Sequence, residues 1–479
     1  MVFTSLIFVI YLPIVFIIYW LLHKRLQLQN GFIVLASYVF YGWWDWRFLA
    51  IIAFTTLWTY FMGILDFHEY RGRKIRLILS LIVNLGILGI FKYYNFFMEQ
   101  MADFLQNAGI SVNYTSLKII LPVGISFYTF QALSYTVDVY RRDITATRDI
   151  IAFFAYISFF PQLVAGPIER ATQLLPQFHK TRNFDYALAV FGCRLMLWGA
   201  FKKMIVADRC AEAVNYLLAI EAPIGISLWA AMIMFAFQIY GDFSGYSDIA
   251  IGCSKLFGFD LMKNFNHPYF STNISEFWRR WHISLNTWFR DYLYIPLGGS
   301  RHGMWKTIRN TYAIFLTSGL WHGANWTFVA WGAFHATCFI PGMLKKKYFS
   351  KYKAPDNTEP GKNNKMLSEI KYCFNCIITF VAVVIGWTFF RAPNISSALK
   401  WIQKMLFDYS TDFHGAGLRI LSVCILPVLA LIVIESFNLS YDYPRLPRNR
   451  ILRWIIYCMM SILIIYFRLP AQKFIYFQF

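Results

Sequence analysis

Long apolar runs recur along almost the whole chain, and few folds accommodate them. The first run covers residues 1–22 and ends at a basic cluster. Others follow at 31–44, 47–67, 76–98, 118–139, 150–168, 187–207, 224–251, 310–343, 375–392, 419–439 and 452–469. Within a bilayer, only helices and closed barrels satisfy their own backbone hydrogen bonds, and these runs have helical rather than strand length. The pattern predicts an all-α, polytopic membrane protein of roughly a dozen helices, some re-entrant because Gly and Pro interrupt them.

Composition and charge agree with this class. The chain is 58% hydrophobic and only 15% charged, which excludes an ordinary soluble protein. The net charge of +20 comes from short basic clusters between the apolar runs, so it indicates a lipid bilayer as partner and no nucleic acid. Because such clusters favour the cytoplasm, we expect both chain termini to lie outside it. The first run has no basic start and no cleavage site, so we expect it to be retained.

The chain reads as one integral membrane domain over residues 1–479, since 351–371 is the only linker-like stretch and no repeat is visible. A catalytic block at 264–335 contains two prominent histidines. His282 follows a capping-box pattern at Asn273 and Glu276, which predicts one continuous helix ending before Pro296. That helix would place four polar side chains on one face: Arg279, His282, Asn286 and Arg290. Two cations beside His282 would favour a neutral, base-competent imidazole.

His322 lies inside the apolar run at 310–343, where an ionisable side chain is costly and by default functional. Asn325, three residues on, is expected to hydrogen-bond to it. The alternative is a histidine that only completes the core. Asp242 interrupts another apolar run and needs either a partner such as arginine or a water-filled cavity. If its role is structural, the partner would be Arg279, Arg280 or Arg290. Two spaced histidines without a third ligand do not predict a metal site.

Five segments carry a resemblance to a known family: LPVGISFYTFQALSYTVDVYR, FFPQLVAGPIER, QIYGDFSGYSDIAIG, FWRRWHISLNTWFRDYLYIPLGG and LWHGANWTFVAWG. They resemble the membrane-bound O-acyltransferase (MBOAT) family, and most closely its bacterial branch that O-acetylates polysaccharides such as alginate and peptidoglycan. The resemblance covers essentially the whole chain. It implies a ring of helices around a central funnel in the bacterial cytoplasmic membrane.

The resemblance also implies a reaction. His322 is expected to be the principal catalytic residue and His282 its companion. Acetyl-CoA would be the donor, with no tightly bound cofactor, and an extracytoplasmic SGNH-hydrolase-like acetyltransferase would complete transfer to a polysaccharide acceptor. Histidine is suited to deprotonating a hydroxyl near neutral pH. The donors considered for the oxyanion are Arg279, Arg290, Asn325 and the indole of Trp321.

The C-terminal tail, residues 470–479, ends in FIYFQF and contains a single hydroxyl. We expect Tyr476 to accept the acyl group, because relatives that acylate cell-surface polymers resemble this chain in ending on an aromatic motif. The alternative is an aromatic anchor at the membrane interface.

Three alternatives to the overall function also stay open: transfer of D-alanyl or another acyl group, a transporter for acylated glycan, and a non-catalytic scaffold.

Overall fold

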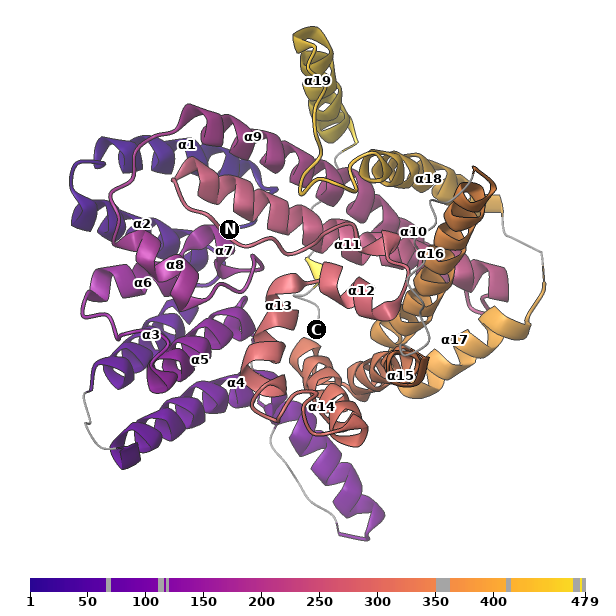
Figure 1. The fold of residues 1–479 in the computed structure, drawn as a ribbon, viewed down its shortest axis with the longest axis horizontal. Helices are drawn as coiled ribbons and strands as arrows, with labels where there is room; N and C mark the ends of the chain where they lie inside the picture. The colour runs from indigo at the N-terminus through magenta and orange to yellow at the C-terminus, as the bar shows by residue number, and fades with distance from the viewer. Residues whose placement is uncertain are drawn as a thin grey trace. The chain divides into compact units, whose positions relative to one another are not determined.

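The computed structural model describes residues 1–65, 70–110, 116–117, 120–349, 362–410, 415–467 and 474–475. These residues form helices and no strand, so the all-α prediction is confirmed (Figure 1). The helices group into two compact units. The described residues of unit 1 lie in 1–200 and 246–262, and those of unit 2 lie in 201–245 and 263–475. The expectation of a single functional domain stays a prediction.

Unit 1 contains the N-terminal helices and the end of α11. Its core is aromatic, and Tyr156, Phe159 and Phe160 are fully buried within it. The helices are α1 (Leu6–Leu21), α2 (Leu26–Gly42), α3 (Phe48–Ile64), α4 (Tyr70–Asn107), α5 (Ile125–Arg141), α6 (Ile150–Ser158), α7 (Phe160–Leu163), α8 (Ala171–Phe178) and α9 (Tyr186–Phe201).

Unit 2 contains both histidines of the catalytic block. Its elements are η1 (Lys202–Ala207), α10 (Asp208–Leu218), the first part of α11 (Gly225–Leu256), η2 (Pro268–Phe270), α12 (Ile274–Arg280), α13 (Ile283–Phe289), η3 (Arg290–Tyr294), α14 (Met304–His322), α15 (Trp326–Phe349), α16 (Lys362–Arg391), α17 (Ile395–Phe407), α18 (Gly415–Ser436) and α19 (Arg450–Tyr466). Of these, η1 and η3 are π-helices, a form that often occurs at functional sites.

Four helical segments among the described residues are long and apolar enough to cross a bilayer: Arg71–Asn107, Gly225–Leu256, Trp326–Lys345 and Met366–Arg391. Three shorter apolar helices add to them, at Leu6–Leu21, Phe48–Ile64 and Ile420–Ser436. Leu21 in α1 and Ile465 in α19 leave about three quarters of their side-chain surface uncovered, at 75% and 77%. Such surfaces suit contact with lipid rather than water.

The apolar run at 310–343 is not one helix. α14 ends at His322, Gly323 is extended, and α15 begins at Trp326 and packs back along α14 (Figure 1). Glycines permit this close approach, because a Cβ at Gly319 would lie 2.3 Å from the carbonyl oxygen of Phe328. Gly332 faces Phe315 in the same way, at 2.2 Å. Small residues commonly bring membrane helices together like this. The tight hairpin places His322 at its turn.

Candidate active site

The backbone at His282 interrupts the helix that the sequence predicts. α12 ends at Arg280, Trp281 is extended, and His282 adopts the left-handed region with φ 44° and ψ 54°. The prediction of one continuous helix is therefore wrong. A left-handed conformation is unfavourable for a residue with a Cβ, so the surrounding structure must hold it. Two backbone hydrogen bonds do so: Asn266 N–H donates to Arg280 O at 2.9 Å, and Ile283 N–H donates to Asn264 O at 2.9 Å.

One side chain determines the tautomer of His282. Asn264 Oδ1 lies 3.1 Å from His282 Nδ1, and it accepts hydrogen bonds from Ser284 Oγ at 2.9 Å and from the Ser284 backbone N–H at 3.3 Å. A backbone N–H can only donate, so the Asn264 atom in this position is the oxygen. His282 Nδ1 must then carry the hydrogen, which leaves Nε2 with its lone pair. Asn264 is a positioning residue that the sequence analysis missed.

The environment of His282 keeps the ring neutral. His282 is 1% exposed, and Nε2 has no hydrogen-bond partner within the described part of the chain. The residue lies between two seven-residue helices, outside the segments long enough to cross a bilayer. Burial lowers the pKa of His282 to about 3, because the imidazolium loses its hydration. The neutral state was expected from neighbouring cations, but desolvation is its cause.

His322 is the last residue of α14 and is 4% exposed. Aromatic rings surround its imidazole: the ring centroids of Trp321, Trp331 and Phe390 lie 5.0, 5.1 and 5.4 Å away. Trp321 also contacts the other histidine, since its ring centroid lies 6.0 Å from that of His282. The two imidazoles, far apart in the sequence, therefore meet around a single indole within unit 2. This group of His282, Trp321 and His322 is the candidate active site.

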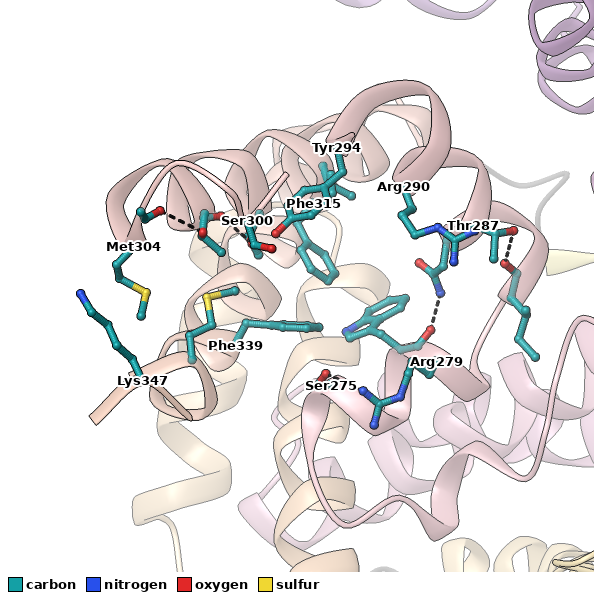
Figure 2. A pocket seen from close by; sticks show the side chains of 18 residues that line it. Ser275, Arg279, Thr287, Arg290, Tyr294, Ser300, Met304, Phe315, Phe339 and Lys347 are labelled. Carbon is teal, nitrogen blue, oxygen red and sulfur yellow. Dashed lines mark hydrogen bonds between the residues drawn. The ribbon is translucent and has the colours of Figure 1, made fainter. Parts of the chain in front are cut away.

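The predicted cations line a neighbouring pocket instead. Arg279, Asn286 and Arg290 belong to the wall of a pocket of about 1040 Å³, whereas His282 packs against Phe243 with ring centroids 4.6 Å apart. Figure 2 shows Arg279 and Arg290 at one end of this pocket and Lys347 at the other. The break at His282 explains the separation, because it turns the histidine off the face that a continuous helix would share.

Two indoles connect the pocket to the active site. Trp278 lines the pocket, and its ring contacts that of Trp331 at 5.5 Å between centroids. Trp331 in turn contacts His322. The Asn286 amide holds this wall in shape by donating to Trp278 O at 2.7 Å and to the carbonyl oxygen of Trp281. Asn286 therefore supports the backbone around His282 rather than presenting a free amide.

Asn325 and Asp242 have other partners than those predicted. Asn325 Oδ1 accepts from Thr327 N–H at 2.9 Å, and Nδ2 donates to Pro393 O at 3.2 Å, so the side chain caps α15. Its amide is occupied by these bonds. Asp242 Oδ1 lies 2.6 Å from Lys203 Nζ. The structural alternative of a partner among Arg279, Arg280 and Arg290 is therefore wrong, and the cation is a lysine of η1.

Tyr476 lies outside the described residues, and the two residues before it are buried. Phe474 and Ile475 are 3% and 2% exposed. Ile475 N–H donates to Asp242 Oδ2 at 2.7 Å, and the Phe474 ring lies 5.9 Å from that of Phe243. Phe243 is the residue that contacts His282. The chain thus passes beside the active site one residue before Tyr476.

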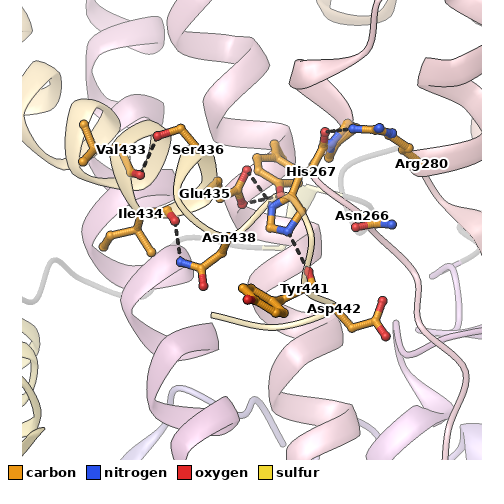
Figure 3. Close-up of polar contacts among 12 residues, drawn as sticks. Asn266, His267, Arg280, Val433, Ile434, Glu435, Ser436, Asn438, Tyr441 and Asp442 are labelled. Carbon is orange, nitrogen blue, oxygen red and sulfur yellow. Dashed lines mark hydrogen bonds and ion pairs between the residues drawn. The ribbon is translucent and has the colours of Figure 1, made fainter. Parts of the chain in front are cut away.

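A buried histidine and carboxylate hold the loop that precedes α12 (Figure 3). His267 Nδ1 lies 3.5 Å from Glu435 Oε2, and its Nε2 lies 3.2 Å from Tyr441 O. Tyr240 donates to Glu435 Oε1 at 2.6 Å, which satisfies the second carboxylate oxygen. His267 also has a left-handed backbone, with φ 46°. These contacts fix the segment 264–273, and with it Asn264.

Buried imidazoles with aromatic walls in an all-α membrane protein fit acyl transfer, which needs a base and a dry site. Residues 141–385 match the model of MBOAT, the membrane-bound O-acyltransferase family. The chain belongs to this family and is an O-acyltransferase.

The similar proteins are named as acyltransferases of alginate, peptidoglycan and teichoic acid. The chain is 39% identical over 452 residues to probable alginate O-acetylase AlgI of Pseudomonas aeruginosa, covering 92% of this chain and 82% of that protein. It is 34% identical over 436 residues to peptidoglycan O-acetyltransferase of Helicobacter pylori, covering 84% and 79%. Teichoic acid D-alanyltransferase of Bacillus subtilis is 29% identical over 252 residues, which cover 48% of this chain and 61% of that protein.

The tautomer assignment predicts a graded mutational series. Asn264→Ala removes the acceptor that holds Nδ1–H and is expected to lower acyl transfer about 10- to 100-fold, because a tautomer with Nε2–H has no lone pair at Nε2 to take a proton. Asn264→Asp keeps an acceptor and should retain most activity. His282→Ala is expected to cost about two orders of magnitude or more. The matched control is Asn266→Ala, in the same loop. Equal losses in Asn264→Ala and Asn266→Ala would point to loop disruption and overturn the assignment.

Proposed function

We propose that this O-acyltransferase takes an acetyl group from cytoplasmic acetyl-CoA and moves it across the membrane for O-acetylation of an extracytoplasmic polysaccharide. The observation that supports this most directly is the pair of buried imidazoles around Trp321, one of which has a tautomer with a free Nε2. The similarity to O-acetyltransferases over most of the chain favours acetyl as the group. The acceptor would be a polymer of the alginate, peptidoglycan or cellulose type.

In the proposed reaction, His322 is the general base. It removes the proton from the accepting hydroxyl while the oxygen attacks the thioester carbonyl, and a tetrahedral intermediate forms. The Trp321 indole N–H donates to the oxyanion. Collapse of the intermediate breaks the C–S bond, and the thiolate takes the proton back from the imidazolium. His282, neutral and adjacent to Trp321, assists as the companion base. Aromatic walls exclude water, so the thioester is protected from hydrolysis.

The pocket beside the active site is proposed to receive the donor. Acetyl-CoA has a phosphorylated nucleotide end and a long thin arm, and the pocket provides cations at both ends: Arg279, Arg290 and Lys347. Arginine and lysine are the usual partners of phosphate. The aromatic wall at Trp278 leads from this pocket toward His322.

The donor site can be tested with purified protein. The double variant Arg279→Gln with Arg290→Gln is expected to raise KM for acetyl-CoA about tenfold while leaving kcat within about twofold, because it removes binding to phosphate and not the base. Arg301→Gln changes an exposed arginine that does not line the pocket and is the matched control. An unchanged KM in the double variant would place the donor elsewhere. Absence of acetyl-CoA turnover by the unaltered protein would instead contradict the proposed donor.

A partner is needed to complete the transfer. The sequence contains no Ser-His-Asp hydrolase domain that would acylate a polymer outside the membrane. We therefore propose an extracytoplasmic SGNH-hydrolase-like acetyltransferase as partner. Transfer of D-alanyl is the second candidate, because the chain is also similar to D-alanyltransferases, but over only about half its length, 48% for the Bacillus subtilis protein. Family membership makes the chain an enzyme, so the transporter and scaffold alternatives are set aside.

The proposed orientation in the bacterial cytoplasmic membrane predicts a labelling pattern. The positive-inside rule assigns Lys24, Arg73, Arg142 and Arg448 to the cytoplasm and both termini to the outside. Single cysteines at positions 2 and 478, in a background without the native cysteines, are expected to react to completion with an impermeant maleimide in intact cells. A cysteine at position 24 should react only after lysis. A terminus that reacts only after lysis contradicts this orientation.

A further inference from the structure

Three buried charges in unit 2 have no part in the reaction described above. Lys203 Nζ lies 2.8 Å from Asp208 Oδ1 and 2.6 Å from Asp242 Oδ1. All three residues are no more than 5% exposed. Removing ions from water costs several kcal/mol for each ion, and a buried ion pair seldom gives back more than that in stability. A cluster of this kind therefore calls for a reason other than stability alone.

The cluster holds a segment from the end of the chain. Asp242 Oδ1 pairs with Lys203, and Asp242 Oδ2 accepts the Ile475 backbone N–H at 2.7 Å. Two carboxylates share one lysine, and the Ile475 N–H supplies a further donor to Asp242. Phe474 and Ile475 are almost completely buried.

The same stretch of α11 contacts the active site. Asp242 binds Ile475, and the next residue, Phe243, contacts both Phe474 and His282, with ring centroids 5.9 and 4.6 Å away. The end of the chain is thus held against the residue that packs on a catalytic imidazole. Only one peptide bond separates Ile475 from Tyr476.

Close packing between α11 and the π-helix η1 makes the cluster possible. A Cβ at Gly241 would lie 2.9 Å from Lys202 O and 3.2 Å from the Ala207 Cβ. The glycine lets the two helices touch where Lys203 and Asp242 meet. The wider turn of a π-helix is a recognised feature of functional sites, and here it presents Lys203 to the carboxylates of α10 and α11.

We propose that Lys203, Asp208 and Asp242 form an anchor that holds the C-terminal segment beside His282 for acyl transfer. They are positioning residues: Asp242 binds the Ile475 N–H, Lys203 orients Asp242, and Asp208 orients Lys203. The role rests on the proposed function, because the anchored segment leads into Tyr476, the proposed acceptor. Loss of the anchor lets water replace the chain end at the site, so the donor is hydrolysed instead of supplying the polymer.

The sharpest test changes the tail and leaves the buried charges intact. Ile475→Pro removes the N–H that donates to Asp242, because proline has no backbone donor, and it also fixes φ and replaces the side chain. Ile475→Val keeps that donor and is the matched control. In a background without native cysteines, a cysteine at position 478 is expected to react with maleimide about tenfold faster in Ile475→Pro than in Ile475→Val. Asp242→Ala should give the same increase, and Asp442→Ala, which removes an exposed carboxylate paired with Lys263, should give none.

The activity measurement separates positioning from folding. In Ile475→Pro, acetylation of the polymer is expected to fall at least tenfold while acetyl-CoA consumption by the purified protein continues, so more of the donor is hydrolysed. Unchanged cysteine reactivity in both Ile475→Pro and Asp242→Ala would overturn the anchor. A faster reaction with full polymer acetylation would overturn the positioning role. The labelling needs no substrate, so failure of the proposed function, seen as absent donor consumption in every variant, is distinguishable from either result.

Discussion

His322→Ala is expected to abolish acyl transfer while the protein remains folded and inserted. The imidazole is the proposed base for the accepting hydroxyl, and loss of a positioned base typically costs about 10²–10⁴ in rate. The ring lies among Trp321, Trp331 and Phe390, so the alanine leaves a cavity but breaks no helix. Assays of polymer acetylation and acetyl-CoA turnover measure the loss of activity. The melting temperature of the protein purified in detergent reports whether it remains folded.

A second buried histidine provides the control for packing. His335 is completely buried against Trp278 and Trp331, with ring centroids 5.0 and 5.2 Å away, and neither of its ring nitrogens has a hydrogen-bond partner within the described residues. His335→Ala removes the same volume from the same aromatic cluster and should retain most of the transfer activity. If His322→Ala and His335→Ala lose activity equally, packing explains both, and His322 is not the base.

Periodicity located the apolar helices well but could not predict the backbone at His282. The stripe of Phe277, Trp281 and Leu285 fits a single helix, and the predicted cap is confirmed, because Asn273 Oδ1 accepts from Glu276 N–H at 2.9 Å. The break at His282 depends on hydrogen bonds from the loop before α12, not on local propensity. The spacing of apolar residues cannot predict backbone strain that tertiary contacts impose at a single residue.

Partners that are distant in the sequence were also beyond prediction. Asp242 was expected to need a cation, which is correct, but nothing in the local sequence distinguishes Lys203 from the arginines of the catalytic block. The choice depends on a π-helix that turns Lys203 toward α11 and on the contact at Gly241. Similarly, both histidines were predicted, whereas Trp321 as their common neighbour emerges only from the fold. The residue types in the sequence indicate the chemistry of a site, but tertiary packing determines which of several residues of the same type lies there.

Tyr476→Phe is expected to lower polymer acetylation by about 100-fold or more. A phenol has a pKa near 10, so it is easier to deprotonate than an alkyl alcohol, and its ester is a more activated acyl donor. In the proposed relay, the phenol oxygen attacks the thioester, its proton passes through His322 to the departing thiolate, and a serine of the partner then takes the acetyl group. The substitution removes only the hydroxyl. Mass spectrometry of the C-terminal peptide after incubation with acetyl-CoA measures the ester directly.

An exposed phenol in α19 supplies the control for this substitution. Tyr466, in α19, is 80% exposed, and Tyr466→Phe removes an equivalent hydroxyl from a residue with no proposed role in the reaction. Its acetylation should match that of the unaltered protein. Phenylalanine has the same aromatic ring as tyrosine, and in Tyr476→Phe the residues Phe474 and Ile475 keep their contacts with Phe243 and Asp242. A tail that only anchors the chain would therefore tolerate this substitution. Wild-type acetylation in Tyr476→Phe, with no ester on the C-terminal peptide, would therefore limit the tail to anchoring and require the acyl group to pass directly from the thioester to the partner.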